Sequence, residues 1–179
     1  LSLCNKNMEN MDTNNNDGKA KHDLLAEVCM AAKYEGESIK THYPKYQTAY
    51  GNSASQLCTV LARSFADIGD IVRGRDLFRG HNQRKKKLEE RLEQMFANIQ
   101  KENGDPTTLK PEEVREYWWN ANRQEIWKAI TCKANDGDKY FRDACNGGKS
   151  STQGRCRCDG AKGANVVPTY FDYVPQYLR

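Results

Sequence analysis

The segment from residue 54 to residue 74 carries the most regular apolar pattern in this chain of 179 residues. Its apolar side chains follow one another at intervals of four, four, three and four residues, at Leu57, Leu61, Phe65, Ile68 and Val72. This spacing is typical of one buried face of an α-helix. Gly74 can end the helix, because glycine readily adopts the left-handed conformation of a helix C-terminus. We therefore expect a central helix on which the other helices pack.

Three more segments show helical periodicity, and the spacing predicts helices over residues 22–43, 84–103 and 111–131. Pro44 should end the first of them, because the residue before a proline avoids helical geometry. The fourth helix carries Trp118, Trp119 and Trp127. We interpret these tryptophans as bundle core; the alternative is a stacking platform for bases or sugars.

The remaining segments have loop compositions. Residues 1–20 are polar and Asn-rich, and residues 132–167 are rich in Gly, Asn, Asp and Ser. The aromatic C-terminus suggests a short helix from Pro168 and a second one from Pro175. Because the chain starts at Leu1 without Met, we expect it to be a piece of a longer protein.

Seven cysteines are many for a reducing compartment, and they favour structural disulfides in an oxidising one. They are Cys4, Cys29, Cys58, Cys132, Cys145, Cys156 and Cys158. Because their number is odd, at least one is expected to lack a partner in this chain, either as a free thiol or because its partner lies in the missing parts of the parent protein. The pairing cannot be read from sequence. Together with the helical periodicity, they predict an all-α fold: a disulfide-stapled helical bundle with irregular loops.

Positive charge is concentrated between residues 73 and 91, a segment with eight Lys/Arg residues and three acidic ones. Four cations, Arg84 to Lys87, stand in the first turn of a predicted helix, where they oppose the helix dipole. One interpretation is a solvated helix end, partly balanced by Lys85–Glu89 and Lys86–Glu90 pairs. The other is an anion site, in which the cations and the free backbone N–H groups converge.

The sequence offers no signature of an enzyme, a cofactor or a metal site. The last four cysteines are spaced by twelve, ten and one residues, unlike paired zinc ligands. Gly147-Gly148-Lys149-Ser150 resembles the end of a phosphate-binding loop, but Asp143 stands where the first glycine would be needed. His22, His42 and His81 lie in separate segments. No apolar run reaches the roughly 18 residues that a membrane-spanning helix needs.

Several strings, taken together, resemble the Duffy-binding-like domain, alpha class, of the variant erythrocyte membrane protein 1 family of malaria parasites. These strings occupy residues 24–36, 57–78, 118–119, 127–132, 140–141, 156–158 and 167–179. The resemblance implies that residues 1–20 are the tail of a preceding subdomain or a linker. It implies that residues 21–179 are the helical second subdomain, and that the third subdomain is absent.

The same resemblance implies a function without catalysis or cofactor. Its members are adhesins on the extracellular face of the infected host erythrocyte, anchored outside this segment, and they vary under antibody pressure. The implied partners are host erythrocyte glycans or glycoprotein receptors, together with the remaining subdomains of the same protein. Alpha-class members are associated with rosetting through heparan-sulfate-like glycans, blood-group sugars or complement receptor.

The basic cluster supplies the residues that would bind an anionic glycan. We expect this site at Arg75, Arg79, Arg84, Lys85, Lys86 and Lys87, where guanidinium and ammonium groups would meet sulfates or carboxylates. The rival hypothesis is a scaffold subdomain that orients its neighbours and contacts no ligand itself. Nucleic-acid binding would share the salt dependence, but no recognised motif supports it, and we expect neither nucleic acid nor a membrane as partner.

Overall fold

The structure is a computed structural model that describes residues 3–14, 17–50, 56–76, 83–104, 109–161 and 165–179, with only the backbone for residues 44–50. Its α-helices are α1 (Lys6–Glu9), α2 (Ala20–Tyr50), α3 (Gln56–Arg73), α4 (Gln83–Glu102) and α5 (Pro111–Ile130). Two 3-10 turns follow, η3 (Phe171–Tyr173) and η4 (Gln176–Leu178). The described residues form no strand, and the all-α prediction is confirmed.

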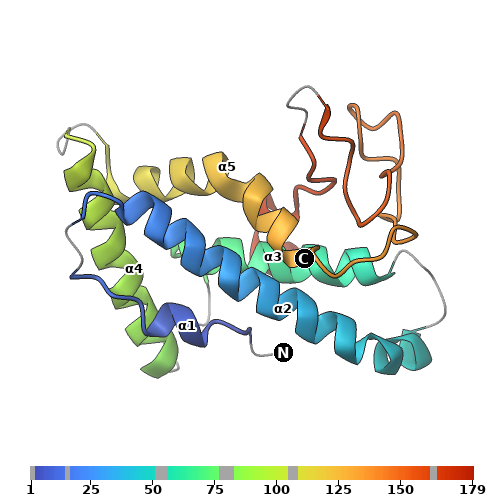
Figure 1. The fold of residues 1–179 in the computed structure, drawn as a ribbon, viewed down its shortest axis with the longest axis horizontal. Coiled ribbons are helices and arrows are strands. Elements are labelled where there is room, and N and C mark those ends of the chain that lie inside the picture. Colours follow the sequence, from blue (N-terminus) through green and yellow to red (C-terminus); the bar gives the residue numbers. More distant parts are fainter. Residues whose placement is uncertain (1–2, 15–16, 51–55, 77–82, 105–108, 162–164) are drawn as a thin grey trace.

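α3 is the central helix that its periodicity predicts. It contacts α2, α5 and η3, and Figure 1 shows it behind α2, which crosses the view diagonally. Leu57, Leu61, Phe65 and Val72 are each at most 2% exposed, and Ile68 is 4% exposed. The helix ends at Arg73, and the next residue, Gly74, has a φ of +72°, the left-handed conformation expected there.

The three tryptophans of α5 complete the core around α3. Trp119 and Trp127 are fully buried, and Trp118 is 5% exposed. The rings of Trp119 and Trp127 each lie 5.1 Å from the ring of Phe65, measured between centroids. These contacts confirm the bundle-core interpretation, and the alternative of a stacking platform is wrong because the indole faces are covered by protein.

Glycine sets the distance between two pairs of helices. A Cβ added to Gly36 of α2 would lie 2.1 Å from the backbone carbonyl oxygen of Ile130, at the end of α5. On α3, a Cβ at Gly69 would lie 2.8 Å from the Trp119 ring. Because the helices approach this closely, a side chain at either position would push them apart.

Two expectations for the N-terminal half are wrong. α2 continues through Pro44 to Tyr50, since a proline removes one helical hydrogen bond and strains its own turn without preventing helix on either side. The polar segment 1–20 contains α1 and contributes Met8 and Met11, 1% and 2% exposed, to the core. With the buried Met8 and Met11 among many asparagines, this segment has too few apolar residues to show a helical spacing in the sequence. That this arm belongs to a preceding subdomain stays a prediction.

Residues 132–161 form an irregular lobe, which we call the disulfide lobe, beyond the C-terminal end of α5 (Figure 1, orange). Cys58 of α3 is bonded to Cys156, and Cys145 is bonded to Cys158. Three cysteines remain unpaired, at Cys4, Cys29 and Cys132, where the odd count requires at least one. The expectation of structural disulfides is confirmed for four of the seven.

The C-terminal segment folds back across α3 and α5 as two short turns. The predicted helix from Pro168 is wrong in its start and length, because the helical residues are 171–173. Val174 is extended, with ψ of 130°, as the residue before Pro175 should be. The second turn begins at Gln176, directly after Pro175, and agrees with the prediction in position.

Candidate binding surface

The six cations that the sequence predicts as one glycan site have different surroundings. Arg79 lies outside the described residues. Arg75 is exposed, and its Nη2 lies 2.5 Å from Oε1 of Glu116 on α5. Lys85 Nζ lies 3.2 Å from Asp76 Oδ2. These two cations are therefore already engaged with carboxylates of the same chain.

The other three cations lie on the first turns of α4. Arg84 Nε lies 3.7 Å from Glu9 Oε2 of α1, a long ion pair between an exposed guanidinium and a largely covered carboxylate. Lys86 and Lys87 are exposed, and no described carboxylate forms an ion pair with either of them. Among the described cations of the predicted site, Lys86 and Lys87 are thus the exposed ones that form no ion pair with a described carboxylate, and Arg84 precedes them on the same helix.

The carboxylate of Glu89, predicted to pair with Lys85, instead forms a partly buried pair with Arg115 of α5. Glu89 accepts hydrogen bonds from Arg115 Nη1 at 2.6 Å and Nη2 at 3.1 Å. The same arginine donates from Nε to the carbonyl oxygen of Val72 at 2.7 Å. Arg115 is 7% exposed. It thus bonds both a carbonyl oxygen in the last turn of α3, which has no partner within the helix, and Glu89 near the start of α4. Arg115 therefore positions the helix that carries Lys86 and Lys87.

A groove of about 410 Å³ lies next to the start of α4, between α1, α3 and α4. Leu3, Ile71 and Leu88 are its apolar lining. Its charged lining is mixed: Lys6, Arg84 and Lys85 face Glu9, Asp67, Asp70 and Asp76. Because carboxylates surround these cations, the groove offers no net attraction for an anion, and an anionic ligand is favoured only outside it.

Asp67 and Asp70 of this groove bind the last residue of the chain. Arg179 donates from Nη2 to Asp67 Oδ1 at 2.9 Å and to Asp70. Burial raises the pKa of both carboxyl groups, and the hydrogen bonds from Arg179 oppose that shift. This arginine side chain is 6% exposed and fixes the C-terminal segment against α3.

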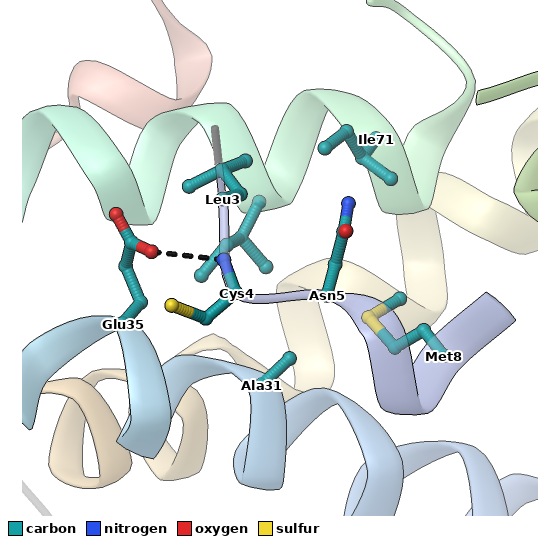
Figure 2. Close-up of a pocket in the computed structure, with 8 residues that line it drawn as sticks. Leu3, Cys4, Asn5, Met8, Ala31, Glu35 and Ile71 are labelled. Carbon is teal, nitrogen blue, oxygen red and sulfur yellow. Dashed lines mark hydrogen bonds between the residues drawn. The ribbon is translucent and has the colours of Figure 1, made fainter. Parts of the chain in front are cut away.

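A second, smaller pocket adjoins this groove (Figure 2). There the N-terminal segment at Leu3, Cys4 and Asn5 lies between α2 and α3. Glu35 of α2 is 3% exposed and accepts the Cys4 backbone N–H at 3.0 Å and the Ser64 hydroxyl at 3.1 Å. Burial raises the pKa of the Cys4 thiol, and the neighbouring Glu35 adds to this shift. Burial, with Glu125 nearby, raises the pKa of Cys29 to about 11. Both thiols are poor nucleophiles at neutral pH.

The most buried ionic group joins the C-terminal segment to α5. Asp172, with a fully buried side chain, accepts two hydrogen bonds from Arg123 at 2.8 Å and one from Trp119 Nε1 at 2.9 Å. Sequence reasoning missed this group, although Arg123 stands on the apolar stripe between Trp119 and Ile126. An arginine at such a position indicates a buried carboxylate partner.

Neither a metal site nor a membrane span is found in the part of the chain that the structure describes. No group of three or more His, Cys, Asp or Glu residues there could hold a metal ion. His22 and His42 are exposed, while His81 lies outside the described ranges. None of the helices that could be searched is long and apolar enough to cross a bilayer.

These features define a disulfide-bonded helical domain with a charged exterior. The family model for the Duffy binding domain matches residues 1–179. The chain therefore belongs to the Duffy binding domain family, as its sequence strings suggested. A comparison with curated protein sequences finds no match.

Three solved structures share the fold. The crystal structure of the NTS-DBL1(alpha-1) domain of Plasmodium falciparum membrane protein 1 (PfEMP1), varO strain, is 36% identical, with a TM-score of 0.75. A double domain of the same protein, NTS-DBL1-alpha with CIDR-gamma, is 38% identical, also with a TM-score of 0.75. The PfEMP1 IT4var13 DBLbeta domain bound to ICAM-1 is 32% identical, with a TM-score of 0.68.

The matches cover nearly all of this chain and a smaller part of each relative. The alignments span 98%, 98% and 96% of the chain but 39%, 25% and 39% of the three relatives. The structures similar to this chain thus contain further segments of comparable or greater length.

Proposed function

We propose that this chain is an adhesion module of a parasite variant surface antigen, displayed on the extracellular face of the infected erythrocyte. It would bind host-cell glycans or glycoprotein receptors, and remaining subdomains of the same protein would complete the domain. Its membership of the Duffy binding domain family supports this proposal, as does the ICAM-1 complex of a DBLbeta relative that is 32% identical. The bundle would act by presenting a rigid surface and would need no cofactor.

Within this function, we propose that the ligand is an anionic glycan of the heparan-sulfate type, bound at the start of α4. The observation that carries the proposal is the exposure of Lys86 and Lys87 without a described carboxylate partner, beside Arg84. Sulfate groups would meet these cations, and the affinity would fall steeply with salt. Arg75 and Lys85 contribute less, because each would have to leave an ion pair.

Heparin-agarose chromatography of the 179-residue chain tests this site. We expect the R84A/K86A/K87A variant to elute at clearly lower salt than the parent chain. The control variant K33A/K101A removes exposed lysines of α2 and α4 and should elute nearly as the parent does. An unchanged elution of R84A/K86A/K87A would refute the site. Heparin should also compete better than duplex DNA of equal charge, since DNA binding would belong to a different class of function.

The second candidate is a scaffold role, in which this segment orients its neighbours and binds no ligand. The ion pairs of Arg75, Arg84 and Lys85 favour it, because half of the six predicted cations are used inside the chain. A glycan array probed with this chain and with a chain extended as in the relatives separates the two. Binding by the extended chain alone would favour the scaffold role.

A further inference from the structure

Exposed cations without a carboxylate partner are more numerous on the disulfide lobe than at the start of α4. Lys133, Lys139, Arg142 and Lys149 are exposed, and no described carboxylate forms an ion pair with any of them. Two of the nearby acids are engaged elsewhere: Asp136 with Arg155, and Asp138 with Lys40. Asp143, next to Arg142, and Asp159 remain as exposed carboxylates, two against the four cations. The lobe therefore carries an excess of free positive charge.

An exposed aromatic ring, that of Phe141, lies beside one of these cations, Arg142. Phe141 is 52% exposed, and the Arg142 guanidinium carbon lies 5.6 Å from the centre of its ring. Exposure alternates along this stretch, with Lys139 and Phe141 outside and Tyr140, only 4% exposed, inside. Lys139 and Phe141 are thus two exposed residues that flank the buried Tyr140, and Arg142 follows Phe141 directly.

The lobe holds Phe141 in place through its neighbour. The backbone N–H of Tyr140 donates to Thr152 Oγ1 at 3.0 Å, and its hydroxyl donates to Thr169 Oγ1 at 3.2 Å. The Cys145–Cys158 disulfide and the bridge between Cys145 and Ser150 close the next turn. A ligand that packs on Phe141 would thus meet a preorganised ring and lose little affinity to ordering it.

We propose that Phe141, Arg142 and Lys139 form a contact site for a sulfated polysaccharide, separate from the start of α4. A sugar ring packs its C–H face on Phe141, while sulfate groups pair with Arg142 and Lys139. The ring supplies binding that persists in salt, and the cations supply binding that salt screens. The inference rests on the proposed glycan-binding function and adds a second position for it.

The test measures the affinity of the 179-residue chain for a heparin-derived oligosaccharide of defined length at several salt concentrations. We expect F141A to weaken binding about tenfold at every salt concentration, as loss of an aromatic contact does. We expect K139A/R142A to weaken binding and to reduce the salt dependence, by about one unit of slope per lost contact. F141Y, which keeps the ring, should bind as the parent chain does.

The matched control is R155A, which removes an exposed arginine of the same lobe that already pairs with Asp136. It should leave the affinity unchanged. Circular dichroism and disulfide mapping identify a misfolded F141A, in which case F141Y and K139A/R142A decide the question. The inference is overturned if K139A/R142A binds like R155A, or if duplex DNA binds the lobe equally well.

Failure of this inference and failure of the proposed function give different results. If R84A/K86A/K87A loses binding while the lobe variants keep it, the lobe site is refuted and the α4 site stands. If only the lobe variants lose binding, the lobe site stands and the α4 site is refuted. If the parent chain does not bind the oligosaccharide at all, both are refuted.

Discussion

The helical bundle and the disulfide lobe reach a fixed structure by different means. In the bundle, apolar side chains recur at helical spacing and bury one another, as Phe65 does with Trp119 and Trp127. In the lobe, few large apolar side chains are buried; two disulfides and local hydrogen bonds constrain the chain instead. We therefore expect the bundle to lose stability when its interior changes, and the lobe to lose it when a cross-link is cut.

Charge pairs follow the same division. The Arg123–Asp172 pair lies in the bundle interior, with side chains 5% and 0% exposed, whereas Arg155–Asp136 in the lobe has side chains 53% and 91% exposed. A buried carboxylate is costly without its partner, while water replaces the partner of an exposed one. The two pairs have similar nitrogen–oxygen distances, 2.8 and 2.9 Å. Removing one partner should nevertheless lower the free energy of unfolding far more for the buried pair than for the exposed one.

The largest expected effect comes from removing the buried carboxylate. D172A should lower the free energy of unfolding by about 3–5 kcal/mol, because it leaves the Arg123 guanidinium buried without a counter-charge. It also leaves the Trp119 indole N–H without its acceptor. Chemical denaturation followed by circular dichroism measures this loss.

The double variant R123M/D172L is the control for this prediction. Replacing both partners by apolar side chains of similar size removes the charge penalty, so it should be clearly more stable than D172A. If the double variant is as unstable as D172A, the loss comes from packing around the C-terminal segment and not from an unpaired charge.

Cutting the cross-link between lobe and bundle should have the next largest effect. C58S/C156S removes a disulfide whose cysteines are 98 residues apart in sequence, and we expect a loss of about 2–4 kcal/mol. C145S/C158S, with a separation of 13 residues, should cost less, because a shorter loop is easier to close. Thermal unfolding of both variants under non-reducing conditions measures the difference. Equal losses would mean that contacts in the folded protein, and not loop length, determine how much each disulfide stabilises it.

A side chain added between two closely packed helices of the bundle should have a third, smaller effect on stability. G36A places a Cβ against the Ile130 carbonyl and should cost about 1–3 kcal/mol, more than the roughly 1 kcal/mol that alanine gains in a helix. The matched control is G137A in the lobe, where an added Cβ meets no atom within 4 Å and which should change stability little. A neutral G36A would show that α2 and α5 can separate at this point without loss.

The bundle could be predicted from sequence because its signal is periodic. The spacing of Leu57, Phe65 and Val72 located α3, and the confirmed bounds of the predicted helices differ by a few residues at most, apart from the α2 extension beyond Pro44. The lobe offered no such signal, since its structure depends on which cysteines pair. Spacing alone does not determine that, and Cys58–Cys156 joins distant segments.

The candidate site was only partly predictable, because charge counts do not show which cations are free. Arg75 and Lys85 belong to a basic run in sequence, yet Glu116 and Asp76 reach them from elsewhere in the chain. Lys139 and Arg142, on either side of Phe141, lie outside that run, and their exposure without an ion pair to a described carboxylate depends on the folding of the lobe. Position in a run is therefore a weaker guide to binding than the absence of an internal partner.

The smallest expected effect concerns the exposed pair of the lobe. D136A removes the partner of Arg155 at an Nε–Oδ1 distance of 2.9 Å, but water solvates both groups. We expect the free energy of unfolding to change by less than about 0.5 kcal/mol, and by still less in 1 M salt, where the pair is screened. R155A should give the same result within error, because it deletes the same interaction. If D136A cost more than about 1 kcal/mol, the lobe would rely on ionic contacts as the bundle does, and the division between the two regions would fail.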